Sequence, residues 1–298
     1  MLTVKKQSNR DFLILNLSDP QLSSDEWQEG QQNREILVNT INELIDRVKP
    51  DFITVSGDVA WAGNRLAYEA FGKFLDSFQI PWAVVWGNHD NQGGPEFIEE
   101  VVELYEKFPY FYYEKGDPAL GNGNYVIGIE EEGKIVEGLI MMDSHDRAPF
   151  VDADGNTHEA WAKLIPEQIV WYKEQIRLLQ EQGCTDTTLI THIPIYAYRQ
   201  AFETSYDERL AGVGHEEVSS FAEEDGVFGA VKELGSTKHI IVGHDHVNNW
   251  MIQYEGVCLI FALKTGPGCY WRPELNGGTV IRVTSEGVSD VYHEVVAV

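Results

Sequence analysis

The stretch WAVVWGNHD, residues 82–90, runs from five apolar residues directly into a glycine and three polar residues. A short apolar run of this kind predicts a buried strand, here over Trp82–Trp86. The residues that follow have helical spacing of apolar side chains over Glu96–Glu106, which predicts a helix. The polar tetrapeptide therefore lies in a loop at the end of a strand, where α/β folds carry functional groups.

The same unit of strand, polar loop and helix occurs twice upstream. Apolar runs predict strands over Phe12–Leu17 and Phe52–Ser56, and helical spacing predicts helices over Arg34–Val48 and Arg65–Phe78. Three such units in a row favour parallel strands with helices packed on their faces.

The rest of the chain changes character. Strands are expected over Tyr125–Ile129, Val136–Met142, Thr188–Thr191 and in the segments from His239 onward, and helices over Glu167–Gln182 and Val227–Leu234. Turn residues at Glu255-Gly256 and Glu286-Gly287 predict hairpins. Ala197–Glu224 is polar and irregular, and we expect it to form a lid or substrate loop. A chain that begins as α/β and ends in strands favours a sandwich of two mixed sheets.

Length and composition set the class of protein. The 298 residues suffice for one large domain, expected over 1–298. The 22 Lys+Arg against 48 Asp+Glu give a formal charge of -26, which disfavours nucleic acid and anionic membrane as partners. No apolar run is long enough to span a membrane, and the polar start predicts no signal peptide. Three scattered cysteines favour a reducing cytoplasm. The oligomeric state is left open.

Five short polar segments each follow a predicted strand. They are Ser18-Asp19-Pro20-Gln21, Gly57-Asp58-Val59, Gly87-Asn88-His89-Asp90, Thr191-His192-Ile193-Pro194 and Gly243-His244-Asp245-His246. Singly, each has an ordinary structural explanation, because Asp or Asn after a strand is often a cap or turn residue. Two histidines at i and i+2 of an extended segment point the same way, which suits two ligands of one metal site.

Together and in this order, the five segments resemble the calcineurin-like metallophosphoesterase superfamily. The resemblance runs from Asp19 to His246, and its most specific parts are Gly-Asn-His and Gly-His-x-His. It implies an α/β fold, a four-layer α/β/β/α sandwich, in agreement with the pattern of elements. The tail, GHDHVNN over residues 243–249 followed by Lys264-Thr265-Gly266, looks closest to single-domain phosphohydrolases similar to purple acid phosphatases.

The resemblance also implies a role for each site residue. Asp58 would bridge two divalent metal ions, Asp19 and His246 would complete the first ion, and Asn88, His192 and His244 would complete the second. His89 would bind no metal and would face the substrate as general acid or as a donor to the phosphoryl group. Two ions ~3.5–4 Å apart would clamp phosphoryl oxygens and supply a metal-bound hydroxide. The mixed ligands suit manganese, iron or zinc.

Two positions depart from the family pattern. Most members have Asp-x-His as the first motif, whereas this chain has Asp19-Pro20-Gln21. Gln21 would either give an amide oxygen to the first metal or hydrogen-bond a bound water. Trp61 stands where purple acid phosphatases have a tyrosine ligand, so we expect no purple colour. The Asp and Arg that protein Ser/Thr phosphatases carry in Gly-Asp-x-Val-Asp-Arg-Gly are also absent.

Other polar residues near these motifs are weaker candidates. Asp143-Ser144-His145-Asp146 follows a predicted strand and either lines the cleft or forms a turn. Tyr196, Tyr198 and Arg199 follow the His192 segment and are candidates for substrate contact.

These observations favour a metal-dependent phosphohydrolase that cleaves phosphate monoesters or small phosphodiesters. One alternative is a cyclic-nucleotide or nucleotide phosphodiesterase. An alternative of another class is a metal-binding scaffold without catalytic activity, which the presence of His89 and of all second-metal ligands disfavours. The expected partner is a small phosphate ester, because a long polyanion would be repelled by the acidic surface.

Overall fold

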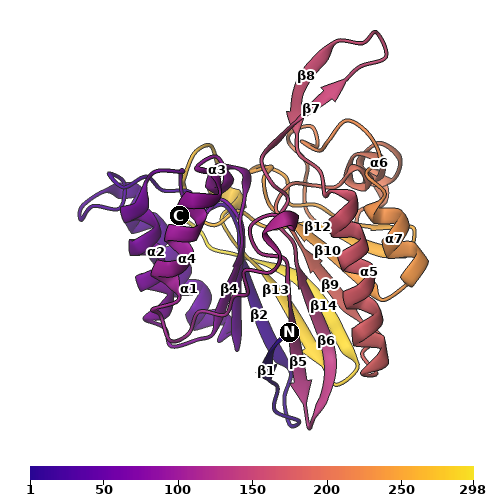
Figure 1. Ribbon diagram of the computed structural model, residues 1–298. Helices are drawn as coiled ribbons and strands as arrows, with labels where there is room; N and C mark the ends of the chain where they lie inside the picture. The colour runs from indigo at the N-terminus through magenta and orange to yellow at the C-terminus, as the bar shows by residue number, and fades with distance from the viewer.

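The computed structural model describes residues 1–298 and contains two mixed β-sheets, with helices on the outer side of each (Figure 1). None of its helices has both the length and the apolar character needed to cross a bilayer. Short 3₁₀ segments occur at Pro118–Leu120, Tyr206–Glu208 and Pro273–Leu275.

The first sheet has five strands in the order β14-β13-β2-β3-β4. Their bounds are Gly287–Val295 (β14), Gly277–Thr284 (β13), Phe12–Leu17 (β2), Phe52–Ser56 (β3) and Trp82–Val85 (β4). β2, β3 and β4 are parallel, and β13 and β14 extend the sheet in antiparallel pairs. The helices of this half are α1 (Gln32–Val48), α2 (Arg65–Asp76), α3 (Asn88–Asn91) and α4 (Gly94–Tyr105).

The second sheet has seven strands in the order β1-β5-β6-β9-β10-β12-β11. Their bounds are Leu2–Lys5 (β1), Tyr125–Glu131 (β5), Lys134–Met141 (β6), Thr187–Ile190 (β9), Thr237–Val242 (β10), Val257–Phe261 (β12) and Met251–Tyr254 (β11). Parallel pairs join β6, β9, β10 and β12. The helices of this half are α5 (Pro166–Glu181), α6 (Tyr196–Ser205) and α7 (Val227–Leu234).

Three apolar clusters fill the spaces between the layers. The central cluster joins the facing sides of the two sheets, for example Ile14 and Phe52 with Ile127 and Leu139. A second cluster packs the first sheet against α1, α2 and α4, and a third packs the second sheet against α5, α6 and α7. Because each sheet buries both faces, its central strands are mostly apolar. This arrangement confirms the predicted four-layer α/β/β/α sandwich.

Most predicted elements are confirmed. β2, β3 and α7 have the predicted bounds, and the other predicted elements end within one or two residues of the observed ends. Turns at the predicted positions join β11 to β12 and β13 to β14. The strand β1 was not predicted, because this short edge strand has one buried residue, Val4, among polar neighbours.

The prediction of an irregular segment over Ala197–Glu224 was wrong for its first part. Residues Tyr196–Ser205 form α6, whose buried side chains are Ala197, Tyr198 and Ala201. The Tyr198 hydroxyl donates to the Ile240 carbonyl at 2.7 Å. The sequence of this helix looks polar because only the narrow stripe of these three buried residues faces the sheet.

A two-stranded hairpin that the sequence reasoning did not predict projects from the body of the molecule (Figure 1). Its strands are β7 (Arg147–Val151) and β8 (Thr157–Trp161), which pair so that Arg147 lies opposite Trp161. Asp154-Gly155 in its turn is a hairpin signal of the sequence.

Candidate metal centre

The sequence-predicted ligands meet where strands of both sheets end. Each follows the carboxyl end of a strand: Asp19 after β2, Asp58 after β3, Asn88 after β4, His192 after β9, and His244 and His246 after β10. All six side chains are buried. The structure thus brings together residues separated by more than 200 positions in sequence.

His192 lies at the middle of this group. Its Nε2 is 3.3 Å from Asp58 Oδ2, 3.1 Å from Asn88 Oδ1 and 3.9 Å from Asp19 Oδ1. The His244 ring lies edge-on to the His192 ring, with 5.2 Å between centroids. Asp19, Asp58 and His192 place one potential ligand atom each within 4.8 Å of one another.

His246 approaches the group from the other side of Asp19. Its Nε2 is 3.3 Å from Asp19 Oδ1, and its Nδ1 donates to the Tyr270 carbonyl at 2.8 Å. The Tyr270 ring stacks on the imidazole at 4.2 Å and 16°. These contacts fix the ring so that Nε2 faces the carboxylate.

The loops that carry the ligands turn sharply. Asp19, Gln21, Asp58 and His244 have φ values of 53°, 44°, 49° and 75°. Such left-handed conformations are uncommon outside glycine and are typical of functional sites held by surrounding structure. Here the Asp19 N–H donates to the Gly57 carbonyl at 3.2 Å, which ties the first loop to the second.

Two of the glycines that precede ligands allow the loops to approach one another. A β-carbon at Gly87 would overlap the Asp58 carboxylate, and one at Gly243 would lie 2.7 Å from Asp19 Oδ2. The glycine in Gly-Asn-His and the glycine in Gly-His-x-His are therefore required by the proximity of the neighbouring ligand.

The donor set fits metal ions. A backbone carbonyl only accepts hydrogen bonds, so His192 Nδ1, which is 2.8 Å from the Ser56 carbonyl, carries a proton. With this proton on Nδ1, a neutral His192 would point the lone pair of Nε2 at the oxygens of Asp58, Asp19 and Asn88. Electron-pair donors that converge in a buried space repel one another unless a cation lies among them.

The pKa values of the same groups show that the site favours positive charge beside its carboxylates. Burial raises the pKa of Asp19 and Asp58, but His246 and His192 outweigh burial and hold both carboxyl pKa values below the ordinary range. Burial lowers the pKa of His192, but Asp58 and Asp19 raise it to about 10. Burial and the charge of His192 lower the pKa of His244 to about 3. A proton on His192 thus occupies the place a metal would take.

The amide side chains at the site are short of partners. Gln21 is buried, and neither Oε1 nor Nε2 has a hydrogen-bond partner. Its backbone N–H donates to the Asp58 carbonyl at 3.2 Å, so residue 21 lies beside the second loop. Asn88 Nδ2 also lacks a partner. Unpaired buried amides are rare and typical of a site that binds an ion or water.

His89 lies at the edge of the group, half-buried, rather than within it. Its backbone N–H donates to Asp58 Oδ1 at 2.9 Å, and its ring contacts Trp61 with 4.3 Å between centroids. His89 Nδ1 is 2.9 Å from Gln92 Oε1, and Gln92 Nε2 donates to Asp146 at 3.4 Å. The ring is thus oriented through Nδ1, which leaves Nε2 free.

Several residues of the site had no role assigned from sequence. Ser18 Oγ donates to Asp19 Oδ2 at 2.5 Å, and the buried Lys264 donates to the Asp19 carbonyl at 2.5 Å. Asp90 accepts from Gly87 N at 2.7 Å and from the Tyr68 hydroxyl at 2.6 Å. The sequence could have indicated these residues. Ser18 and Asp90 belong to segments that already contain a predicted ligand, and Lys264 belongs to the Lys-Thr-Gly segment that supports the family resemblance.

Three of the weaker candidates have structural roles. Tyr198 is fully buried in the core, so the expectation that it contacts substrate was wrong. Arg199 donates to the Val218 carbonyl at 3.2 Å. Asp143 accepts from the backbone of Asn122 at 2.7 Å and of His145 at 2.9 Å, which is a turn-stabilising role.

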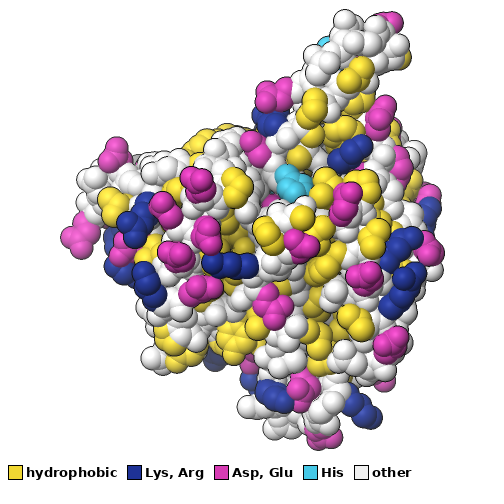
Figure 2. All heavy atoms as spheres, in the orientation of Figure 1, with side chains coloured by type: hydrophobic (Ala, Val, Ile, Leu, Met, Phe, Trp, Pro, Cys, Tyr) yellow, Lys and Arg dark blue, Asp and Glu magenta, His cyan; other side chains and the backbone are white.

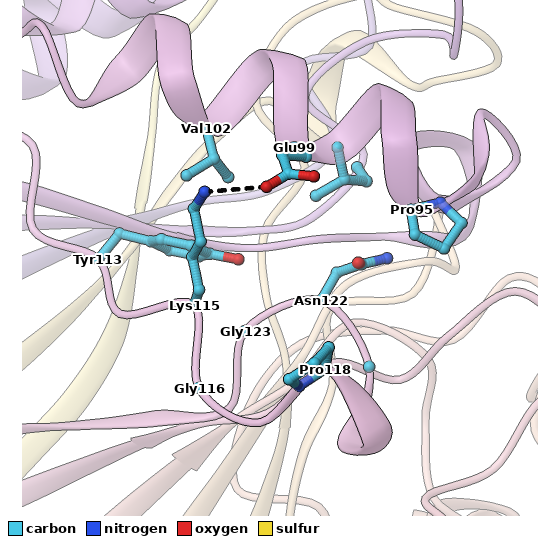
Figure 3. Close-up of a pocket in the computed structure, with 11 residues that line it drawn as sticks. Pro95, Glu99, Val102, Tyr113, Lys115, Gly116, Pro118, Asn122 and Gly123 are labelled. Atoms are coloured by element: carbon cyan, nitrogen blue, oxygen red, sulfur yellow. Dashed lines mark hydrogen bonds and ion pairs between the residues drawn. The ribbon is translucent and has the colours of Figure 1, made fainter.

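A separate hollow lies between α4 and the loop Tyr113–Gly123 (Figure 3). Lys115 and Glu99 form an ion pair of 3.3 Å across it. Asn122 in its wall donates to Asn91 Oδ1 at 2.7 Å, and Asn91 follows His89 by two positions. The hollow therefore neighbours the metal centre without containing any of its ligands.

Comparisons with known proteins identify the family of the chain. A family model described as calcineurin-like phosphoesterase matches residues 12–248. Probable inactive purple acid phosphatase 29 of Arabidopsis thaliana is 25% identical over 259 residues, which cover 78% of this chain and 64% of that protein. Phosphatase DCR2 of Saccharomyces cerevisiae is 28% identical over 262 residues, 82% of this chain and 44% of that protein.

The chain therefore spans less than two thirds of the length of these relatives. A dimetal phosphatase from Danio rerio has a similar fold, with a TM-score of 0.58 at 13% identity over 95% of this chain and 98% of that chain. The ordered ligand segments, the sandwich and the match over residues 12–248 show that the chain belongs to the calcineurin-like phosphoesterase family.

Proposed function

We propose that the chain is a metal-dependent phosphohydrolase that cleaves phosphate monoesters or small phosphodiesters at a dinuclear centre. The observation that carries this proposal is the convergence of His192 Nε2 with oxygens of Asp58, Asn88 and Asp19 in a buried space. Two divalent ions, manganese, iron or zinc, fit this mixture of carboxylate, amide and imidazole ligands.

The contacts support the division of ligands that the family resemblance implies. The Asp19 carboxylate lies beside His246, as expected for two ligands of the first ion. The Asn88 amide oxygen lies beside His192, as expected for two ligands of the second ion. Asp58 would bridge the ions. The unpartnered Gln21 oxygen supports a place for this amide at the first ion, as a ligand or through a water.

When bound, two divalent ions supply Lewis-acid charge and a water of lowered pKa. The residues of the chain supply orientation and a proton. As the bond between phosphorus and the leaving oxygen breaks, protonated His89 gives the proton of Nε2 to that oxygen. Trp61 and Gln92 hold the His89 ring in place for this transfer.

A scaffold without activity is the competing proposal, because a similar plant protein is named probable inactive. Both His89 and a full set of second-metal ligands are present here, which favours activity. We also propose a reducing compartment such as the cytoplasm, since none of the three cysteines forms a disulfide.

The test is a screen with p-nitrophenyl phosphate, bis(p-nitrophenyl) phosphate and nucleotides, run on metal-stripped protein with Mn²⁺, Fe²⁺ or Zn²⁺ added back. We expect hydrolysis only after metal is restored. Protein that binds two ions and hydrolyses none of these esters would support the scaffold instead.

A further inference from the structure

The base of the β7–β8 hairpin lies directly against the metal centre. The Trp161 ring meets the His244 ring edge-on, with 4.2 Å between centroids. The Arg147 guanidinium lies over the same Trp161 ring, 3.5 Å from its centroid. One aromatic ring therefore separates this cation from a proposed metal ligand.

The residue before Arg147 reaches the opposite side of the site. Asp146 accepts from Gln92, which in turn contacts the His89 ring. The base of the hairpin thus contacts the His244 side through Trp161 and the His89 side through Asp146 and Gln92.

The Arg147 side chain is available to a ligand. It is exposed, and it forms no hydrogen bond or ion pair with another residue. The other cation at the site, Lys264, is buried and donates to the Asp19 backbone. Figure 2 shows acidic and basic side chains side by side where the hairpin leaves the body. In a chain of formal charge -26, a guanidinium that has no acidic partner and lies beside the candidate centre is open to an anionic ligand.

The hairpin also has a firm base. Ala162 N donates to the Asp146 carbonyl at 3.0 Å, and Phe150 packs edge-on against Phe221 at 5.9 Å. Stacking on Trp161 restricts the guanidinium, so less conformational entropy is lost when it binds an anion.

We propose that Arg147, held on the face of Trp161, is an anion-binding subsite that takes the non-bridging oxygens of a phosphate monoester. This inference rests on the proposed function. A monoester presents a dianionic phosphoryl group, which a planar guanidinium binds through two parallel hydrogen bonds. A diester has one charge fewer and a second substituent on phosphorus. The subsite therefore favours monoesters over diesters.

The experiment compares wild type with Arg147→Gln, Arg147→Lys and Arg177→Gln, all loaded with Mn²⁺ and checked for metal content. Arg177 is exposed on the outer helix α5, so its substitution removes the same charge away from the centre. Binding of inorganic phosphate is measured by calorimetry, and kcat/KM is measured with p-nitrophenyl phosphate and bis(p-nitrophenyl) phosphate.

We expect Arg147→Gln to keep its metal, to bind phosphate about 10- to 100-fold more weakly, and to lose kcat/KM mainly on the monoester. Arg147→Lys should recover part of the loss, and Arg177→Gln should match wild type. Unchanged phosphate binding in Arg147→Gln would overturn the subsite, and equal losses on both esters would overturn the monoester preference. If wild type hydrolyses neither ester, the proposed function fails while the phosphate titration still decides the subsite.

Discussion

Two sets of buried carboxyl groups in this molecule have pKa values that are shifted in opposite directions. Asp19 and Asp58, at the carboxyl ends of β2 and β3, are surrounded by histidines that keep their pKa values low. Glu137 on β6 is equally buried, but its partner is the Thr188 hydroxyl, which donates at 2.9 Å. Burial, aided by the charge of Asp186, raises the pKa of Glu137 to about 8.

The difference is the one expected between a metal centre and a buried acid. Burial alone favours the neutral carboxylic acid, whereas converging imidazoles or metal ions keep a carboxylate ionised. Asp19 and Asp58 are thus prepared to bind cations. Glu137 lies in the core, is protonated near neutral pH and is not expected to bind a metal ion.

The strongest test of this contrast is Asp58→Asn beside Glu137→Gln. Each change replaces a buried carboxyl with an amide of similar shape. Asp58→Asn should lose most bound metal and lower kcat/KM by roughly 10⁴-fold, because one bridging carboxylate holds both ions. Metal analysis and hydrolysis of p-nitrophenyl phosphate measure both effects. Glu137→Gln should retain metal and activity, and equal losses in the two variants would show that the two carboxyl groups do not differ in metal binding.

His89→Ala separates chemistry from metal binding within the site. The variant should keep both ions and lower kcat by ~10²–10⁴, because it lacks the proton donor for the leaving oxygen. Metal content and steady-state kinetics on the same preparation are the measurements. If the variant emerges without metal, the assignment of His89 to substrate rather than to an ion is wrong.

Metal removal should lower the stability of the fold because Asp19 and Asp58 lose their bound ions. Glu137 should play no part in this effect. Ions that bind only the folded chain add about 2.7 kcal/mol per site at a hundredfold excess over Kd. Thermal unfolding with and without Mn²⁺ should therefore show a clear rise in Tm for wild type and Glu137→Gln. A similar rise for Asp58→Asn would locate the stabilising ion elsewhere.

Glu137 should govern part of the pH dependence of stability. Its folded pKa of about 8 lies above the ordinary value, so the folded state binds the proton more tightly. The resulting stabilisation is complete below the unfolded pKa and is lost as pH rises through about 8. Glu137→Gln should lessen the fall in unfolding free energy between pH 5 and 8 by about 3 kcal/mol. Urea unfolding at several pH values tests this, and an unchanged slope would show that Glu137 ionises normally.

The smallest effect concerns colour. Trp61, which the family resemblance places at the position of the tyrosine ligand, packs on His89, and the Tyr270 hydroxyl donates to Glu216 at 2.9 Å. Iron-loaded protein should therefore show no tyrosinate charge-transfer band in its visible spectrum. Such a band would mean that Tyr270 or another tyrosine leaves its partner to bind the metal.

The sequence predicts the sandwich and the positions of the ligand segments because both depend on local patterns. Apolar runs define the strands, and Asp19 or His192 directly follows such a run. The contact of Trp161 with His244 depends instead on how a hairpin folds back over another sheet, which no local pattern contains. For the same reason α6 was missed, since its narrow apolar stripe is defined only by the sheet it covers.

We propose that the buried, ionised carboxylates hold two catalytic metal ions. The most direct measurement is the metal content of stripped protein titrated with Mn²⁺, followed in parallel with hydrolysis of p-nitrophenyl phosphate. We predict two ions per chain and activity that rises with their binding. A chain that stays free of metal, or hydrolysis that persists in fully stripped protein, would contradict the claim.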